Sequence, residues 1–205
     1  MDHYLDIRIR TDPEFSAPQL MNALFSKLHQ ALVALKSTGI GVSFPEVDEE
    51  KPSLGTCLRL HGTAAALSTL MEWPWLQGLR DYLHLGKVSP VPMGAQHRQV
   101  RRVQTKSNPE RLRRRQMRRH GYQTEGDARQ AAIQRLIKDR QISYVAANKQ
   151  VDRIRKCELP FLSLKSQSTG QAFRLFIRHD PPVHQQQAGL FNSYGLSASA
   201  TVPWF

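Results

Sequence analysis

The first half of the chain changes its hydrophobic period several times, and these changes restrict the fold more than any other feature. Residues 4–10 alternate, with Leu5, Ile7 and Ile9 on one side and charged residues on the other, which predicts a half-buried strand. The next segment places apolar side chains at helical spacing and predicts an amphipathic helix. Its stripe comprises Met21, Leu24, Phe25, Leu28, Leu32 and Leu35.

The alternation between strand and helix patterns then continues. Apolar runs at 39–45 and 56–62 predict two further strands. Residues 63–79 predict a second helix that is broken at Pro74, and residues 82–92 predict a fourth strand. The order strand-helix-strand-strand-helix-strand is that of a ferredoxin-like (RRM-like) domain. Since RNA-binding modules and enzymes share that fold, it indicates no function by itself.

The positive charge of the chain is concentrated in one stretch. The 205 residues contain 29 Lys and Arg against 17 Asp and Glu, a formal net charge of +12. Between Arg98 and His120 there are ten Lys and Arg and one acid, Glu110, so this stretch carries +9 and the other 182 residues carry +3. Charge that is gathered into a patch favours a specific polyanionic partner.

The centre of this stretch, RLRRRQMRR at 111–119, predicts a helix with one cationic face. Asn108 can cap the helix, and Pro109 and Glu110 are both favoured in its first turn. The arginines that share the face are Arg111, Arg114, Arg115, Arg118 and Arg119. Each like-charged pair at this spacing costs an isolated helix about 0.2–0.5 kcal/mol. With almost no acid interleaved, and Arg prevailing over Lys, nucleic-acid binding is favoured over a merely solvated face.

Two residues ahead of this helix could read bases. Arg can form two hydrogen bonds to guanine and Gln two to adenine. Arg102 and Gln104 are two apart in a linker, residues 93–107, that is predicted to be extended, so both would point the same way. The helix would fit the major groove of DNA, whereas that of A-form RNA is deep and narrow except near a helix end or loop. Composition alone leaves DNA and RNA both open.

The remainder of the chain predicts a second part. A helix is expected over residues 127–140, within a polar segment at 121–158. Residues 159–179 predict a β-hairpin that turns at Ser168-Thr169-Gly170, and short strands are expected near the end. The fold class is therefore α+β: a ferredoxin-like domain at 1–92, the linker, and a domain at 108–205 with the arginine-rich helix and the hairpin.

Few side chains outside the basic stretch suggest chemistry. His29 borders the apolar stripe of the first helix and can be a half-buried boundary residue. The polar turn at 166–169 and Tyr194 have equally ordinary structural explanations. Cys57 and Cys157 are far apart, and no P-loop, carboxylate pair or zinc-ligand spacing occurs, so neither metal nor cofactor is expected.

The location of the protein can also be predicted. Its N-terminal residues, MDHYLDIRIR, form a charged strand pattern and not a signal peptide. No apolar run approaches the ~18 residues of a membrane span. We expect a cytoplasmic protein without a membrane partner.

Seven blocks spread over the chain resemble one family. They are MDHYLDIRIR, LHQALVAL, IGVSFP, RVQTKSNPERLRRRQMRRH, SLKSQSTGQAFRLFIRH, YGL and VPWF. Together they are similar to the type I-F CRISPR-associated endoribonucleases, which process repeat RNA. The blocks with the arginines and with SQSTG are the most specific. We expect the likeness to stop at about 121–158, where this chain is predicted to be longer than the family pattern.

The resemblance implies a defined function. The chain would cut a CRISPR transcript within each repeat, just 3′ of a short stem-loop, and stay bound to the product hairpin. It would act as a monomer within the type I-F surveillance complex, beside its backbone and large subunits. RNA carries its own nucleophile, the ribose 2′-hydroxyl, so no metal is required. The expected products are a 2′,3′-cyclic phosphate and a 5′-hydroxyl.

The resemblance also implies roles for individual residues. His29 would be the catalytic histidine, Ser166 would hold the attacking ribose, and Tyr194 would lie beside the histidine. Arg102 and Gln104 would read bases at the foot of the stem. The other RNA contacts would come from a groove-inserted helix, a loop near the cleaved strand and a stacking aromatic: Arg114, Arg115, Arg118, Arg119 and His120; Gln167, Ser168 and Thr169; and Phe173.

Two other functions would retain the cationic helix. A non-catalytic subunit could cap an RNA hairpin within a CRISPR effector complex without using His29. A double-stranded DNA binder would use the same helix but would not discriminate against deoxyribose. Only an endoribonuclease needs both the histidine and the 2′-hydroxyl.

Overall fold

A computed structural model describes residues 1–48, 52–103, 125–148, 159–166 and 169–205 of the chain. Helices and antiparallel strands are mixed, which confirms the predicted α+β class. The chain divides into two units, Met1–Val103 with Leu159–Phe205 and Gln104–Glu158. Within the described residues, no helix is long and apolar enough to cross a membrane.

The first sheet is built from strands in residues 1–92. β1 (His3–Ile9), β2 (Gly41–Ser43), β3 (Cys57–Gly62) and β4 (Leu83–Leu85) pair in the order β2-β3-β1-β4, all antiparallel, and β5 (Ser89–Pro90) pairs with β1. Leu5 lies opposite Leu60 and Ile7 opposite Leu58. The apolar side chains of β1 and β3 therefore share one face.

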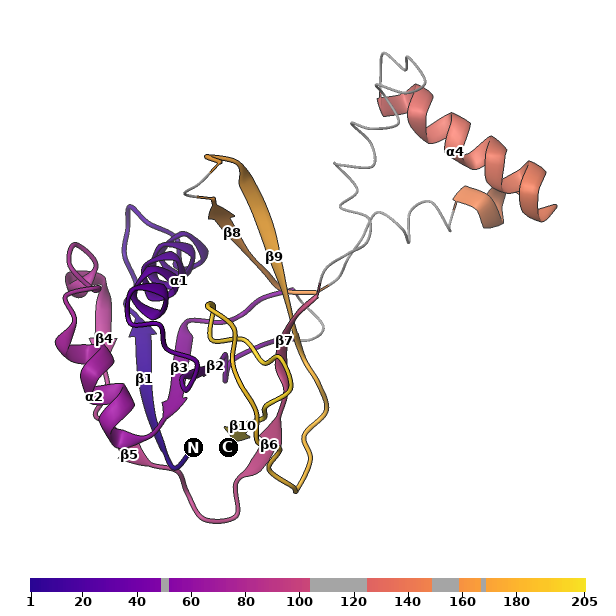
Figure 1. Ribbon diagram of the computed structural model, residues 1–205. Helices are drawn as coiled ribbons and strands as arrows, with labels where there is room; N and C mark the ends of the chain where they lie inside the picture. The colour runs from indigo at the N-terminus through magenta and orange to yellow at the C-terminus, as the bar shows by residue number, and fades with distance from the viewer. Residues whose placement is uncertain (49–51, 104–124, 149–158, 167–168) are drawn as a thin grey trace. The chain divides into compact units, whose positions relative to one another are not determined.

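Two helices cover this apolar face (Figure 1). They are α1 (Ala17–Ala34) and α2 (Ala64–Glu72). The predicted stripe of α1 is buried from Met21 to Leu32, in one cluster with Leu67 and Leu70 of α2. α2 ends before Pro74, as predicted, because the residue ahead of a proline is driven into an extended conformation.

Part of the opposite face of the first sheet is covered by the C-terminal residue, around Arg59. Arg59 on β3 pairs with Asp6 through hydrogen bonds of 2.6 and 3.0 Å and donates a third, of 3.0 Å, to the backbone oxygen of Phe205. The guanidinium lies over the rings of Tyr4 and Phe205, at 4.8 and 4.1 Å from their centroids. RNA-recognition modules stack bases on the open face of such a sheet. At Arg59 this chain has no open face for that mode of binding.

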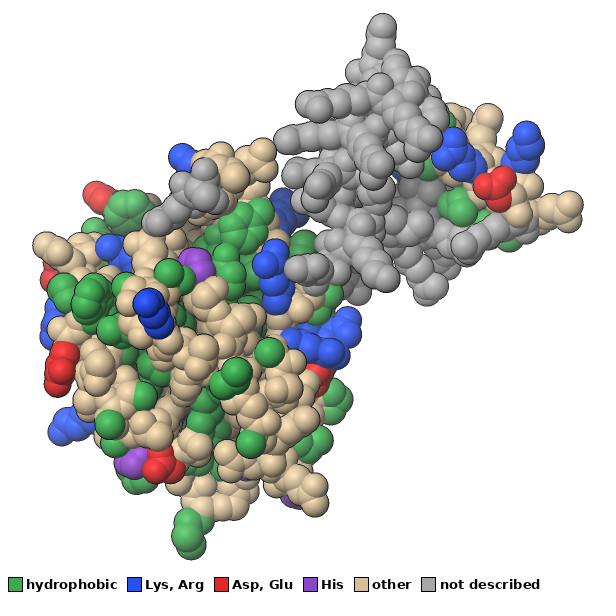
Figure 2. Space-filling model, viewed as in Figure 1, with side chains coloured by type: hydrophobic (Ala, Val, Ile, Leu, Met, Phe, Trp, Pro, Cys, Tyr) green, Lys and Arg blue, Asp and Glu red, His purple; other side chains and the backbone are tan. Residues whose placement is uncertain are grey.

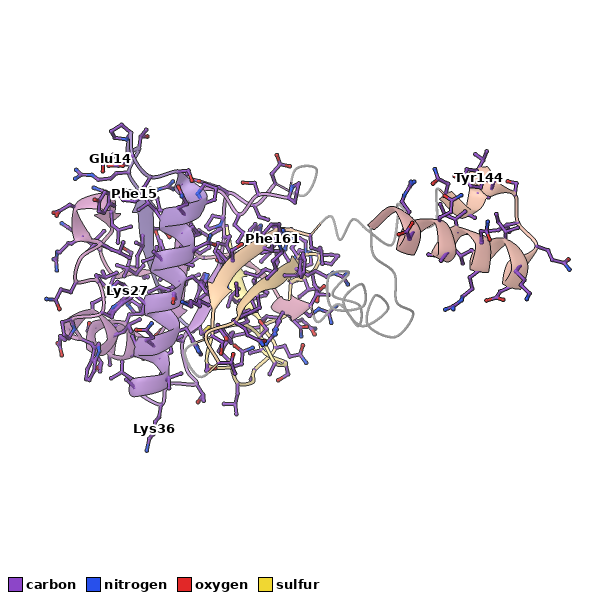
Figure 3. The ribbon with its side chains drawn as sticks, turned by 90° about the horizontal axis from the view of Figure 1, so that it is seen from above. Glu14, Phe15, Lys27, Lys36, Tyr144 and Phe161 are labelled. Atoms are coloured by element: carbon purple, nitrogen blue, oxygen red, sulfur yellow. The ribbon has the colours of Figure 1, made fainter. Side chains whose placement is uncertain are left out.

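A second sheet lies beside α1. β7 (Val100–Val103), β8 (Phe161–Lys165) and β9 (Ala172–His179) pair antiparallel in the order β7-β9-β8, while β6 (Gln96–Arg98) pairs with β10 (Val202–Trp204). The hairpin β8-β9 turns where the sequence predicted, with Gly170 at φ +66°. The backbone N–H of Ser163 donates to the side-chain oxygen of Asn22 on α1, at 2.9 Å. Figure 3 shows the strand that carries Phe161 alongside the helix.

The compact units differ in extent from the predicted parts of the chain. Residues 159–205 belong with residues 1–103 because they share one core. Leu175 and Ile177 of β9 are buried in the same cluster as Leu28 of α1. The described part of the predicted linker forms β6 and β7.

The smaller unit is described only at residues 125–148. α4 (Glu125–Arg140) confirms the helix predicted there. It ends at Arg140, the next residue, Gln141, has φ +49°, and residues 144–148 are helical again. Buried Ile133 and Ala147 pack against Ala132, Leu136, Ile137 and Ile142. The arginine-rich segment at 111–119 lies outside the described residues.

Two buried histidines join elements of the larger unit. Nε2 of His61, on β3, lies 2.8 Å from the hydroxyl of Ser43 on β2. Nε2 of His179, on β9, accepts a hydrogen bond of 3.4 Å from the backbone N–H of Phe44. Burial lowers the pKa of His61 and of His179 to about 3 in each case. Both rings are therefore neutral in the folded protein near neutral pH.

Candidate active site

His29 lies on α1 at the border of the buried stripe, and its side chain is half-buried. Its Nδ1 is 2.7 Å from the backbone carbonyl oxygen of Ser193. A carbonyl oxygen can only accept, so this hydrogen bond assigns the ring proton to Nδ1. In the neutral ring Nε2 then carries the lone pair, and this is the form of histidine that can take a proton from a hydroxyl group.

Tyr194 fixes the plane of the histidine ring. The two rings stack with their centroids 3.9 Å apart and an angle of 9° between them. The Tyr194 ring is also parallel to that of Phe25, to within 8° and with the centroids 6.2 Å apart. Phe25 and His29 are four residues apart on α1, so both point from one side of the helix. The stack orients the imidazole through apolar and aromatic contact.

Ser166 is held in the hairpin turn. Its N–H donates to the carbonyl of Gln171 at 2.9 Å, and its carbonyl accepts from Gly170 at 2.8 Å. Its hydroxyl oxygen accepts a hydrogen bond of 3.3 Å from the N–H of Thr169, which is itself exposed. These contacts fix the position of Ser166 relative to the two strands of the hairpin.

The β8-β9 hairpin contacts the face of α1 from which the side chain of His29 projects. Asn22, which holds β8, and His29 are seven residues apart, which is about two helical turns. The sequence interpretation of His29 as a half-buried boundary residue is therefore correct as a description. The sequence did not predict the contact between His29 and Ser193, which is 164 residues away in the chain.

Two predicted RNA contacts lie on the second sheet. Arg102, on β7, is exposed and stands opposite Ile177 of β9. Phe173 is half-buried and stands opposite Leu164 of β8. Phe173 and Ile177 are four residues apart on β9, so Phe173 and Arg102 share one face of this sheet.

Cations gather at this sheet. Figure 2 shows Lys and Arg side chains over β7 and β9. Exposed arginines on these strands are Arg101, Arg102, Arg174 and Arg178. Arg101 forms an ion pair of 2.7 Å with Asp180, and Arg174 lies 4.7 Å from the ring centroid of Phe161.

Apart from Thr169 in the hairpin turn, the other predicted RNA contacts fall on parts of the chain that the structure does not describe. Gln104, Arg111, Arg114, Arg115, Arg118, Arg119, His120, Gln167 and Ser168 lie outside the described residues. In the described part of the chain, no three His, Cys, Asp or Glu side chains gather as metal ligands would. Burial raises the pKa of the Cys57 thiol to about 11, so this cysteine is not a nucleophile at neutral pH.

Sequence reasoning missed the loop that approaches His29. The motif Asn192-Ser193-Tyr194-Gly195 combines three residue types that favour turns, Asn, Ser and Gly, and this pattern could have indicated a tight turn. In the structure Gly195 has φ +70° and the Ser193 carbonyl contacts the histidine.

Comparison with known proteins assigns the chain to a family. The family model described as CRISPR-associated protein (Cas_Csy4) matches residues 4–205. The chain belongs to the Csy4 family. A Csy4 relative, the CRISPR-associated endonuclease Cas6/Csy4 of Pseudomonas aeruginosa (strain UCBPP-PA14), is 52% identical over 205 residues and covers all of both chains. The protein of the same name from Escherichia coli (strain UTI89 / UPEC) is 46% identical, again over the full length of both chains.

The comparisons confirm two predictions and contradict a third. The likeness was expected to stop at about 121–158, but the matches run through these residues and cover the relatives over their full length. The motifs quoted from the sequence pointed to the family that the full-length matches show. The chain is also confirmed as an enzyme, an endoribonuclease of the Csy4 family. The roles of single residues stay predictions, now with a geometry for His29, Tyr194, Ser166, Arg102 and Phe173.

Proposed function

We propose that the chain is a metal-independent endoribonuclease that cuts CRISPR precursor RNA on the 3′ side of the repeat stem-loop and stays bound to the guide-RNA hairpin. The observation that carries this proposal is the His29 arrangement: the Ser193 carbonyl holds Nδ1 at 2.7 Å, which in the neutral ring leaves the lone pair on Nε2. Membership of the Csy4 family supports the class of substrate.

The proposed reaction uses the nucleophile of the RNA. Nε2 of His29 takes the proton of the 2′-hydroxyl next to the scissile phosphate, a role worth about 10²–10⁴-fold in rate. The 2′-oxygen bonds to phosphorus and the bond from phosphorus to the 5′-oxygen breaks. The departing oxygen takes up a proton, so the products are a 2′,3′-cyclic phosphate and a 5′-hydroxyl. Ser166 would hold the ribose so that the 2′-oxygen is aligned for attack.

RNA binding would involve both halves of the chain. The sheet order β2-β3-β1-β4 with two helices on one face supports a ferredoxin-like domain at 1–92 that carries the histidine. Arg102 and Gln104 would read bases, Phe173 would stack at the foot of the stem, and the helix at 111–119 would contact phosphates. Family membership supports a place as a monomeric, cytoplasmic subunit beside the backbone and large subunits of a type I-F surveillance complex.

One experiment tests the proposed reaction. The protein is incubated in EDTA with labelled RNA that contains its own CRISPR repeat, and in parallel with the same RNA carrying one 2′-deoxyribose at the cut site. We expect a single cut with a 2′,3′-cyclic phosphate in the first RNA and none in the second. Tight binding without any cut in either RNA would instead indicate a subunit that only caps the hairpin.

The arginine-rich helix makes a separate prediction about salt. Arg115→Ala and Arg119→Ala should each weaken hairpin binding and lower the slope of log K against log salt by roughly one, because each removes one phosphate contact. Binding is measured at several salt concentrations. Arg80→Ala is the control, since Arg80 is an exposed cation outside the predicted RNA surface. Unchanged slopes would mean that the cationic face points away from the RNA.

A further inference from the structure

We propose that Asn192 is a positioning residue of this active site, because its side chain fixes the loop whose carbonyl selects the reactive tautomer of His29. The inference rests on the proposed function and adds a residue to it. Asn192 does not touch His29 in any described contact. It acts through the backbone of the two residues that follow it.

The side chain of Asn192 organises its own loop. Its Oδ1 accepts two hydrogen bonds, of 2.9 Å from the N–H of Tyr194 and 3.2 Å from the N–H of Leu196. Its backbone N–H donates to the carbonyl of Leu196 at 2.9 Å, and its carbonyl accepts from Gly195 at 2.8 Å. Four hydrogen bonds of one residue therefore close the turn from 192 to 196.

The closed turn is fastened to the core of the larger unit. The N–H of Val42 on β2 donates to the carbonyl of Gly195 at 2.9 Å. Gly195 has φ +70°, and a Cβ atom at this position would come within 2.7 Å of a Val42 methyl group. Neither the conformation nor the space admits a side chain. The loop thus has one position relative to β2.

The position of the 192–196 turn determines which groups contact His29. Between Asn192 and Gly195, the turn presents the Ser193 carbonyl to Nδ1 at 2.7 Å and the Tyr194 ring to the imidazole face at 3.9 Å. The Ser193 carbonyl keeps the ring proton on Nδ1. Without that acceptor the proton can sit on Nε2, which then has no lone pair for the 2′-hydroxyl proton. The tautomer of His29 is therefore set by a turn that Asn192 closes.

The test compares two substitutions at one position. Asn192→Ala removes the acceptor oxygen and should lower the single-turnover cleavage rate by about 10–100-fold, because a misplacement of a reactive group by about 1 Å can cost about 100-fold. The affinity for RNA with a 2′-deoxyribose at the cut site should stay within about twofold. Asn192→Asp keeps an acceptor oxygen and should restore most of the rate.

A matched control removes a side-chain acceptor that closes a similar turn before α1. Oδ1 of Asp12 accepts hydrogen bonds from the N–H groups of Glu14 and Phe15, at 2.9 and 2.8 Å. Asp12→Ala therefore opens a comparable turn away from the histidine. It should leave the cleavage rate unchanged.

The tautomer itself can be observed. Long-range 15N–1H spectra should show Nδ1–H for His29 in the wild-type protein and a mixture of tautomers in Asn192→Ala, with His29→Gln identifying the resonances. An Nε2–H tautomer in the wild type, or a normal rate in folded Asn192→Ala, would overturn the inference. If Asn192→Ala does not fold, the wild-type tautomer and the rate of Asn192→Asp decide. Cleavage by the wild type tests the proposed function separately.

Discussion

His29→Ala is expected to abolish cleavage of the repeat RNA while leaving its affinity for the hairpin almost unchanged. Loss of the base should lower the rate by about 10²–10⁴-fold. Binding should persist because the half-buried histidine contributes one hydrogen bond and one ring stack, both within the protein. The cations predicted to contact phosphates lie elsewhere in the sequence.

Rate and affinity must be measured separately. Single-turnover cleavage gives the rate, and binding of an RNA with one 2′-deoxyribose at the cut site gives the affinity. Added imidazole should restore part of the activity of His29→Ala, because a small base can enter the space left by the ring. His84→Ala, at an exposed position on β4, is the control. Equal loss of rate and affinity would refute the role of His29 as base.

Lowering the pH from 7.5 to 5.0 is expected to lower the free energy of unfolding by about 4 kcal/mol. His61 and His179 have pKa values of about 3 in the folded protein and ordinary values near 6.5 once unfolded. Between these values the unfolded state binds more protons than the folded state, so stability falls as the pH falls below about 6.5. Each histidine contributes about 2 kcal/mol at pH 5.

Urea unfolding at the two pH values, followed by tryptophan fluorescence, measures this loss. His61→Gln and His179→Gln should each remove about 2 kcal/mol of the pH-dependent loss. Burial also lowers the pKa of His97, which adds to the loss in the same direction, and His84→Gln, at an exposed position, is the control. Burial raises the pKa of Glu46, but the hydrogen bonds from Thr56 and Arg8 outweigh burial and lower the pKa below its ordinary value of 4.5. The contribution of Glu46 is therefore lost mainly below pH 4.5, outside this range. Equal stability at both pH values would mean that the folded protein does not lower the pKa values of the two histidines.

The sequence by itself determined the features that depend on near neighbours. Periodicity predicts the helical stripe from Met21 to Leu32. Backbone sterics predict the end of α2 before Pro74 and the hairpin turn at Gly170. The motifs also indicated the family. Seven sequence blocks spread along the chain resemble those of one family, and the match to its family model confirms it. His29 was a candidate only through that resemblance.

The tertiary structure alone decided the contacts between distant segments. His29 meets the Ser193 carbonyl across 164 residues, and Arg59 meets the backbone of Phe205 across 146. No periodic pattern specifies such pairs, because they depend on how strands, helices and loops pack around one core. The same packing placed residues 159–205 in the unit of residues 1–103 and brought the Asn192 turn to the histidine. Local sterics formed the elements, and long-range packing assembled the site from them.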